Sequence, residues 1–183
     1  MEQLLLLPPS PFTPGVSHDS TILYCPSDVE AAYQEWGANC GPAALAAVLG
    51  VPLARVRRLF PEFARKPWVN PSTMWTALSL ARRPARKLGQ QWPAYGLCHI
   101  QWEGPWLSPG VPIGAAYRHT HWIGAATSPA GRPMIYDINA DAWLTMASWE
   151  QEVVSLITEM MPRATGGWHI RWSCAVEEKE PLP

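Results

Sequence analysis

The chain has 183 residues, of which 48% are hydrophobic and 16% are charged. This length suits a single domain, and this composition supplies enough apolar side chains for a core, which argues against global disorder. The formal net charge of −1 offers no basic surface to hold nucleic acid, so we expect no nucleic-acid partner.

The ends of the chain and its cysteines predict a cytoplasmic protein. The apolar run 4–7 is too short to span a bilayer and has neither a positive leader nor a cleavage site, so we expect no signal peptide and no membrane insertion. The cysteines are widely scattered without a CxxC pair, which favours neither a zinc knuckle nor a disulfide framework. A reducing compartment is the expected setting. The four are Cys25, Cys40, Cys98 and Cys174.

The N-terminal half of the chain predicts mostly helices. Residues 1–20 are proline-rich and are interpreted as an arm, ahead of one domain over 21–178 and a tail at 179–183. The domain opens with a short strand at 21–25 and a helical turn at 28–33. Further helices are predicted at 40–49, 52–60 and 70–82.

The helix at 40–49 carries the clearest signals. Asn39 is a suitable N-cap, Pro42 lies in the first turn, and Gly50 provides the stop. The body, AALAAVL, is almost wholly apolar. We therefore expect this helix to be central and buried on most sides.

The C-terminal half predicts a sheet. Strand-like segments separated by Pro and Gly turns lie at 97–102, 112–117, 121–127, 133–139 and 168–175. An amphipathic helix is predicted at 149–161, with Ser148 and Gln151 as a capping box. Helices followed by a mostly antiparallel sheet make the predicted fold class α+β.

Cys40 stands at the start of the apolar helix, where a structural thiol has little reason to be. A helix N-terminus and a nearby imidazolium both stabilise the thiolate, which is the nucleophilic form of cysteine. His121 opens the strand HWIGAAT and is the favoured imidazole, with His119 as the alternative. A catalytic imidazole also needs a partner on its second ring nitrogen.

The next strand, MIYDIN, offers two such partners. Asp137 and Asn139 are spaced by two and are expected to share one face of that strand. A hairpin turn around 128–132 would bring them beside His121. Attack on an amide also needs donors for the oxyanion. The backbone N–H of Cys40 is one candidate, and the side-chain amide of Gln34, on the loop leading into the helix, is the other.

Gln34, Cys40 with Gly41-Pro42, then His121 and Asp137, follow the order of the papain-like cysteine peptidases, which this chain resembles. Its CGPAAL helix start, LGVPL segment and HW strand followed by YD are most similar to the bacterial double-glycine leader peptidases and their stand-alone relatives. The similarity covers roughly residues 30 to 140. These 183 residues contain no transporter segment, so we do not expect the resemblance to extend to export-coupled leader processing.

The resemblance implies a role for each residue. Cys40 would be the nucleophile, His121 the general base and acid, Asp137 the residue that orients the histidine, and Gln34 part of the oxyanion hole. Asn139 could replace Asp137, because papain itself uses asparagine. A small residue such as glycine before the cleaved bond is implied by the family alone.

The expected function is hydrolysis of a peptide or isopeptide bond in a peptide or protein substrate, with the oligomeric state left open. One alternative keeps the chemistry but passes the acyl group to an amine or thiol, as a transferase does. The other keeps the fold as a binding or assembly protein without turnover. His119 and His121 are too few ligands for a metal site, so we expect no metal and no cofactor. The remaining cysteines are expected to be unreactive core thiols.

Overall fold

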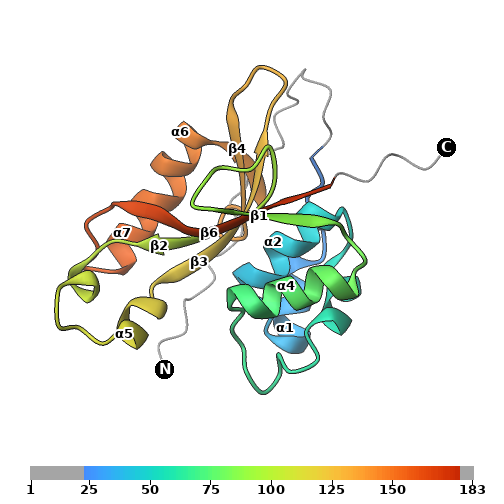
Figure 1. Ribbon diagram of the computed structural model, residues 1–183, viewed down its shortest axis with the longest axis horizontal. Coiled ribbons are helices and arrows are strands. Elements are labelled where there is room, and N and C mark those ends of the chain that lie inside the picture. Colours follow the sequence, from blue (N-terminus) through green and yellow to red (C-terminus); the bar gives the residue numbers. More distant parts are fainter. Residues whose placement is uncertain (1–22, 178–183) are drawn as a thin grey trace.

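A six-stranded antiparallel sheet runs through the computed structural model, which describes residues 23–177 (Figure 1). The strand order is β1-β6-β2-β3-β4-β5, and every neighbouring pair is antiparallel. The strands are β1 Ala85–Gly89, β2 Tyr95–Trp102, β3 Thr120–Thr127, β4 Pro133–Asp137, β5 Ala142–Thr145 and β6 Trp168–Val176. The fold class is therefore α+β, as predicted. The predicted arm at 1–20 and tail at 179–183 lie outside the described residues.

The helices form two groups. Those that precede the sheet in the chain lie together on one side of it, and the helix between β5 and β6 lies on the other side (Figure 1). The first group is α1 Val29–Trp36, α2 Cys40–Leu49, α3 Leu53–Val56, the 3-10 turn η1 Arg57–Leu59 and α4 Pro71–Leu80. The second is continuous and consists of α6 Met146–Trp149, the π-helical turn η3 Glu150–Val154 and α7 Ser155–Met160. The β2–β3 connection adds η2 Pro105–Leu107 and α5 Ile113–Tyr117.

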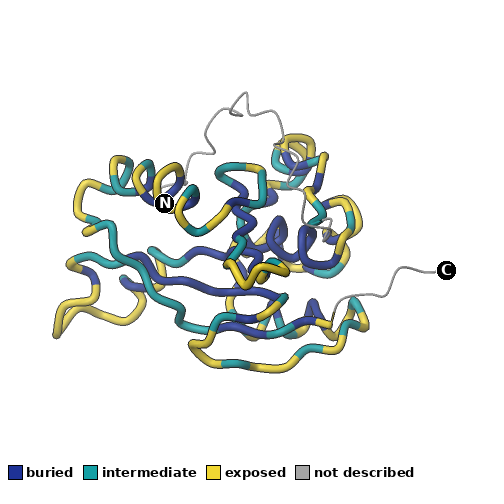
Figure 2. Tube along the Cα trace, turned by 90° about the horizontal axis from the view of Figure 1, so that it is seen from above, coloured by how far each residue is buried: buried dark blue, intermediate teal, exposed yellow. Residues whose placement is uncertain are grey.

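Both faces of the central strands are covered. Leu97 and Trp122 belong to the apolar cluster built on α2, whereas Ile100 and Ile123 belong to the cluster built on α6–α7. Successive strand residues point to opposite faces, so strands β2 and β3 are buried almost throughout. Figure 2 shows the buried segments, in dark blue, in the middle of the molecule. This explains why these strands are nearly continuous apolar runs in the sequence.

Helix α2 forms as its sequence predicts. The Asn39 side chain accepts a hydrogen bond from the backbone N–H of Gly41 at 3.3 Å, and Gly50 ends the helix in the left-handed conformation with φ 66°. Every residue from Gly41 to Leu49 is buried, and only Cys40 keeps part of its surface open.

Some local expectations were wrong. The segment 112–117 is not a strand but contains helix α5, which begins after Pro112 and is rich in alanine, the strongest helix former. The predicted helix at 149–161 begins earlier, at Met146, because Thr145 provides the N-cap and accepts from the Ser148 N–H at 3.2 Å. Residues 23–25 form no regular element, and the rest of the predicted first strand lies outside the described residues.

Strands β1 and β5 were not predicted. β1 is mostly exposed and pairs on one side with β6, so its sequence, ARKLG, lacks an apolar run. β5 is four residues long and pairs with β4. Both are the outer strands of the sheet and are less buried than the central ones. Their sequences therefore carry the weakest apolar pattern.

Within residues 23–177, no single helix is long and apolar enough to cross a bilayer. The pair Cys40–Leu49 and Leu53–Leu59, which is bent by 105°, meets the length and composition criteria only when taken together.

Candidate active site

A buried histidine–aspartate pair connects strands β3 and β4. His121 Nε2 lies 3.0 Å from Asp137 Oδ2, and the two residues are 3% and 0% exposed. The predicted hairpin makes the contact possible: Thr127 pairs with Pro133 across the turn, and Ser128 N–H donates to the Arg132 carbonyl. His121 lies near the start of β3 and Asp137 at the end of β4, so their side chains meet at one edge of this hairpin.

The Cys40 thiol lies beside the His121 ring, where its charge and its hydrogen bond both raise the pKa of that ring. Because Nε2 of that ring faces Asp137, Nδ1 is the nitrogen left for the sulfur. Helix α2 packs against β3 and so carries Cys40, its first residue, to this place. Three side chains that the sequence places far apart are thus brought into one chain of contacts, in the order thiol, imidazole, carboxylate.

The charges of this cluster favour an ion pair at neutral pH. Burial lowers the pKa of His121, but the negative charges of Asp137 and Cys40 and the hydrogen bonds to both leave that pKa well above its usual value of 6.5. Burial raises the pKa of Asp137, yet the His121 charge and several hydrogen bonds outweigh it and leave that pKa below 3.8. An imidazolium held beside a thiol stabilises the thiolate.

Four hydrogen bonds converge on the Asp137 carboxylate. Oδ2 accepts from His121 and from the indole N–H of Trp149 at 2.8 Å. Oδ1 accepts from the backbone N–H of Asn139 at 2.9 Å and from its side-chain Nδ2 at 3.0 Å. The aspartate is therefore fully hydrogen-bonded without water, and its orientation toward His121 is fixed.

Asn139 has a different place from the one predicted for it. It was expected to share a strand face with Asp137, but β4 ends at Asp137, and Asn139 lies in the turn that follows. Its amide and backbone N–H both donate to Asp137 rather than to His121. The structure therefore gives contact with the histidine to Asp137 and makes Asn139 a support for that aspartate.

Trp149 was missed by sequence reasoning. It is fully buried, follows β5 on α6, and donates its indole N–H to Asp137. Trp102 stacks against it with ring centroids 5.8 Å apart and lies 5.9 Å from the His121 ring. A buried tryptophan needs a partner for its N–H, which is the one signal that could have pointed to Trp149. The two indoles exclude water from the ion pair and thereby strengthen it.

The structure corrects the expected position of Gln34. It lies within α1 rather than on a loop, because that helix continues to Trp36 and ends at Gly37 in the left-handed conformation. Gln34 is exposed, and its side-chain amide donates to Glu30 at 2.9 Å. The predicted oxyanion donor is thus engaged within its own helix. The backbone N–H of Cys40 lies in the first turn of α2, where N–H groups have no carbonyl one turn earlier.

The other described histidines do not contact Asp137, and each has a different partner. His119 precedes β3, and its ring stacks on Trp106 with centroids 3.7 Å apart. His99 is buried against Trp122, where burial and the charges of Arg171 and His121 lower its pKa to about 3. His169 pairs with Glu103 at 3.1 Å.

The segment 67–70 fixes the start of α2. Asn39 Nδ2 donates to the Pro67 carbonyl at 2.9 Å, and the indole N–H of Trp122 donates to the Val69 carbonyl at 2.7 Å. A Cβ on Gly41 would lie 2.7 Å from Val69 Cγ2. The glycine that follows the cysteine is therefore required by packing, since a larger residue would push this segment away.

Two of the remaining cysteines agree with their expected role and one does not. Cys98 and Cys174 are buried, and burial raises the pKa of both thiols, to about 12 for Cys174. Cys25 is exposed rather than in the core, and it precedes α1 in a stretch without regular structure. Burial of its sulfur and the charge of Asp141 raise its pKa.

Chemically, the arrangement provides a nucleophile, a base that can take its proton, and a carboxylate that stabilises the protonated base. Among residues 23–177, no group of three or more His, Cys, Asp or Glu side chains is arranged to hold a metal ion. A scan against models of known protein families gave no match, and a search of curated proteins found no relative.

Proposed function

We propose that this chain is a papain-like cysteine peptidase that cleaves a peptide or isopeptide bond. The observation that carries the proposal is the buried contact of His121 with Asp137 at 3.0 Å, with the Cys40 thiol in reach of the same ring. A buried ion pair is costly to build. Its position beside a thiol at a helix N-terminus is best explained by catalysis.

In the proposed reaction, the Cys40 thiolate attacks the carbonyl carbon while His121 holds the proton. The backbone N–H of Cys40 donates to the oxyanion. His121 then gives its proton to the leaving amine, and a thioester on Cys40 remains. Water, deprotonated by His121, hydrolyses the thioester and restores the thiol. Asp137 keeps the ring oriented throughout and stabilises its positive charge whenever His121 carries the proton.

One observation favours the alternative of a binding or assembly protein that keeps the fold. The Gln34 amide, which the resemblance assigns to the oxyanion hole, is engaged with Glu30. In a peptidase, this amide would have to exchange Glu30 for the substrate oxygen. A transferase would share the acylation half of the reaction and differ only in what resolves the thioester.

The rate at which iodoacetamide alkylates each cysteine tests the proposal. Cys25 is the internal control, because it is an exposed residue whose thiol has no imidazole partner in the described structure. An activated Cys40 should react at least tenfold faster than Cys25 near pH 6, where ordinary thiols are protonated. A peptide aldehyde should protect Cys40 alone. Equal rates at the two cysteines would refute the peptidase and favour the binding protein.

Turnover separates hydrolysis from transfer. A library of fluorescence-quenched peptides should be cleaved by the native chain and not by its Cys40→Ala variant. Adding hydroxylamine or a free amino acid amide as acceptor should leave the products unchanged if water resolves the thioester. Products that carry the added amine would instead identify a transferase.

A further inference from the structure

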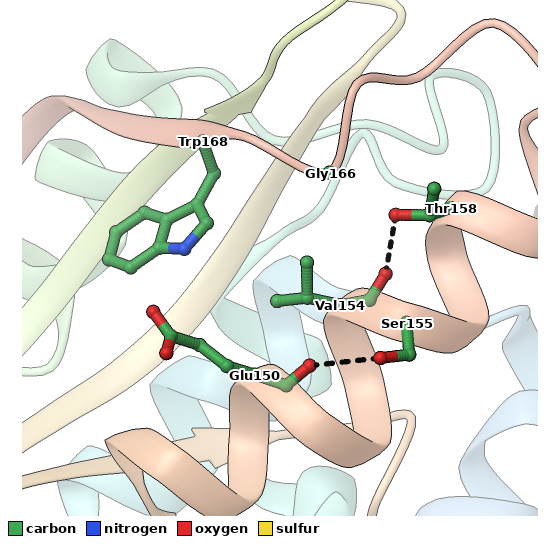
Figure 3. Close-up of a pocket in the computed structure, with 6 residues that line it drawn as sticks. All are labelled: Glu150, Val154, Ser155, Thr158, Gly166 and Trp168. Atoms are coloured by element: carbon green, nitrogen blue, oxygen red, sulfur yellow. Dashed lines mark hydrogen bonds between the residues drawn. The ribbon is translucent and has the colours of Figure 1, made fainter.

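A cavity lined in part by Trp168 lies close to Trp149, the residue whose indole N–H donates to the proposed catalytic aspartate. Its volume is about 530 Å³, and it opens between the α6–α7 helix and the segment that leads into β6. Figure 3 shows the Glu150 carboxylate and the Trp168 indole on one side of this hollow, with Ser155 and Thr158 along the helix. The lining residues are Glu150, Val154, Ser155, Thr158, Gly166 and Trp168.

The polar groups of this cavity are mainly hydrogen-bond acceptors. The Ser155 hydroxyl donates to the Glu150 carbonyl at 3.3 Å, and the Thr158 hydroxyl donates to the Val154 carbonyl at 2.8 Å. Both protons are thus used within the helix, which leaves the hydroxyl lone pairs for an occupant. The Glu150 carboxylate accepts only. Among the lining residues, the Trp168 indole N–H is the one side-chain donor that is not already used within the helix.

The Glu150 carboxylate forms no ion pair within residues 23–177. The ion pairs found there connect Arg57 with Glu35, Arg65 with Glu62, His121 with Asp137, and His169 with Glu103. An open carboxylate beside an indole is the combination that binds ammonium or guanidinium groups, through charge and through the aromatic face.

The helix wall is distorted at this place. Glu150–Val154 is a π-helical turn, a wider form that is uncommon and often found at functional sites. The turn begins directly after Trp149, and Trp168 packs edge-on against Trp149 with ring centroids 5.2 Å apart. Trp149 in turn donates to Asp137. Trp149 therefore connects Trp168, which lines the cavity, to Asp137 in the catalytic cluster.

We propose that this cavity binds a basic side chain, lysine or arginine, of the polypeptide substrate. The identity of the occupant as substrate rests on the proposed peptidase function. The basic side chain sets its charge against Glu150 and its apolar stem against Val154 and Trp168. A substrate held there would be selected by a positive residue at a distance from the cleaved bond.

The test is a titration of the full chain carrying Cys40→Ala, so that turnover does not alter the probe. The probe is Nα-acetyl-arginine amide, and the matched neutral probe is Nα-acetyl-citrulline amide, which has nearly the same shape. Binding is followed by the NMR signal of the Trp168 indole N–H, assigned with Trp168→Phe. We expect the arginine probe to shift this signal and to bind about fivefold or more tightly than citrulline.

Variants locate the site. Glu150→Gln should reduce arginine binding to the level of citrulline. Glu152→Gln makes the same charge change on an exposed neighbour that does not line the cavity, and it should leave binding intact. Equal binding of the two probes to the unsubstituted cavity would overturn the proposal without any variant, as would equal losses in Glu150→Gln and Glu152→Gln.

The two proposals fail separately. Arginine binding at Trp168 in a chain whose Cys40 is not selectively alkylated would keep the basic-group site and remove the peptidase. Selective alkylation of Cys40 without discrimination between arginine and citrulline would keep the peptidase and remove this site.

Discussion

Replacing Asp137 by asparagine should disrupt the cluster more than any other isosteric change. The carboxylate accepts two hydrogen bonds on each oxygen, whereas asparagine keeps one oxygen and replaces the other with an NH2 group. If the NH2 faces Asn139, the two partly buried N–H groups of that residue lose their acceptor. If it faces the other way, the Trp149 N–H loses its acceptor and His121 must place its proton on Nδ1, the nitrogen that should receive a proton from Cys40.

The magnitude follows from these unpaired donors. Each buried N–H without an acceptor costs about 1–3 kcal/mol, so we expect the free energy of unfolding to fall by about 2–4 kcal/mol. The His121 pKa should also fall, because burial then acts without the opposing charge of Asp137. The rate of Cys40 alkylation at pH 6 should drop about 10²-fold or more, as expected when a general base is lost.

Urea unfolding followed by tryptophan fluorescence, together with alkylation rates between pH 5 and 9, measures both effects. Asp141→Asn is the matched control, because Asp141 lies in the same turn region, is only partly buried, and accepts one long hydrogen bond of 3.4 Å from Tyr136. It should change stability by less than about 1 kcal/mol. Should Asp137→Asn unfold at the same urea concentration as Asp141→Asn, the carboxylate does not organise this site.

Three further predictions concern the surroundings of the cluster. Asn39→Ala and Asn70→Ala each remove a helix N-cap, and each should lower the free energy of unfolding in urea by about 1 kcal/mol. Only Asn39→Ala should also slow Cys40 alkylation, because it removes the hydrogen bond that connects the start of α2 to the segment 67–70. Equal alkylation rates in the two variants would contradict this. Gly41→Ala should destabilise by about 1–3 kcal/mol through its clash with Val69, whereas Gly114→Ala, which meets open space in α5, should be neutral or slightly stabilising in the same assay. Because the pKa of His121 is raised in the folded protein, its contribution to stability is complete below pH 6.5 and is lost as the pH rises through its folded-state pKa. Because the pKa of Asp137 is lowered, its contribution is complete above pH 3.8 and is lost as the pH falls through its folded-state pKa. Unfolding free energies measured from pH 3 to 9 should therefore be highest between these limits, and His121→Gln should flatten the alkaline decline.

The fold was predictable from the sequence at two kinds of element: strands that are buried on both faces, and helices whose N-cap and C-cap residues are clear in the sequence. Helix α2 has an Asn cap, an apolar body and a Gly stop, so its sequence specifies both ends. Strands β2 and β3 are buried on both faces and read as apolar runs. The segment 112–117 was misassigned because five or six apolar residues fit a short helix as well as a strand, and only contact with the rest of the chain decides between them.

The site was predictable to the extent that its residues carry a local signal. Cys40 stands out because a thiol opens an apolar helix, and the spacing from His121 to Asp137 fits one hairpin. Trp149 carries no such signal, because its contact with Asp137 depends on how α6 packs beneath the sheet. Gln34 fits a pattern of spacing, yet its rotamer follows the i−4 neighbour Glu30 on the same helix face.

The segment 67–70 holds the proposed nucleophile, Cys40, and its proposed base, His121, at one spacing through main-chain oxygens. Asn39, next to Cys40, donates to the carbonyl of residue 67, and Trp122, next to His121, donates to the carbonyl of residue 69. Every amino acid supplies a carbonyl, so the bridging atoms persist whatever side chain residue 68 carries. Trp68, at 59% exposed, is therefore a position where evolution or design can change the surface beside these carbonyls while the distance between sulfur and imidazole stays the same.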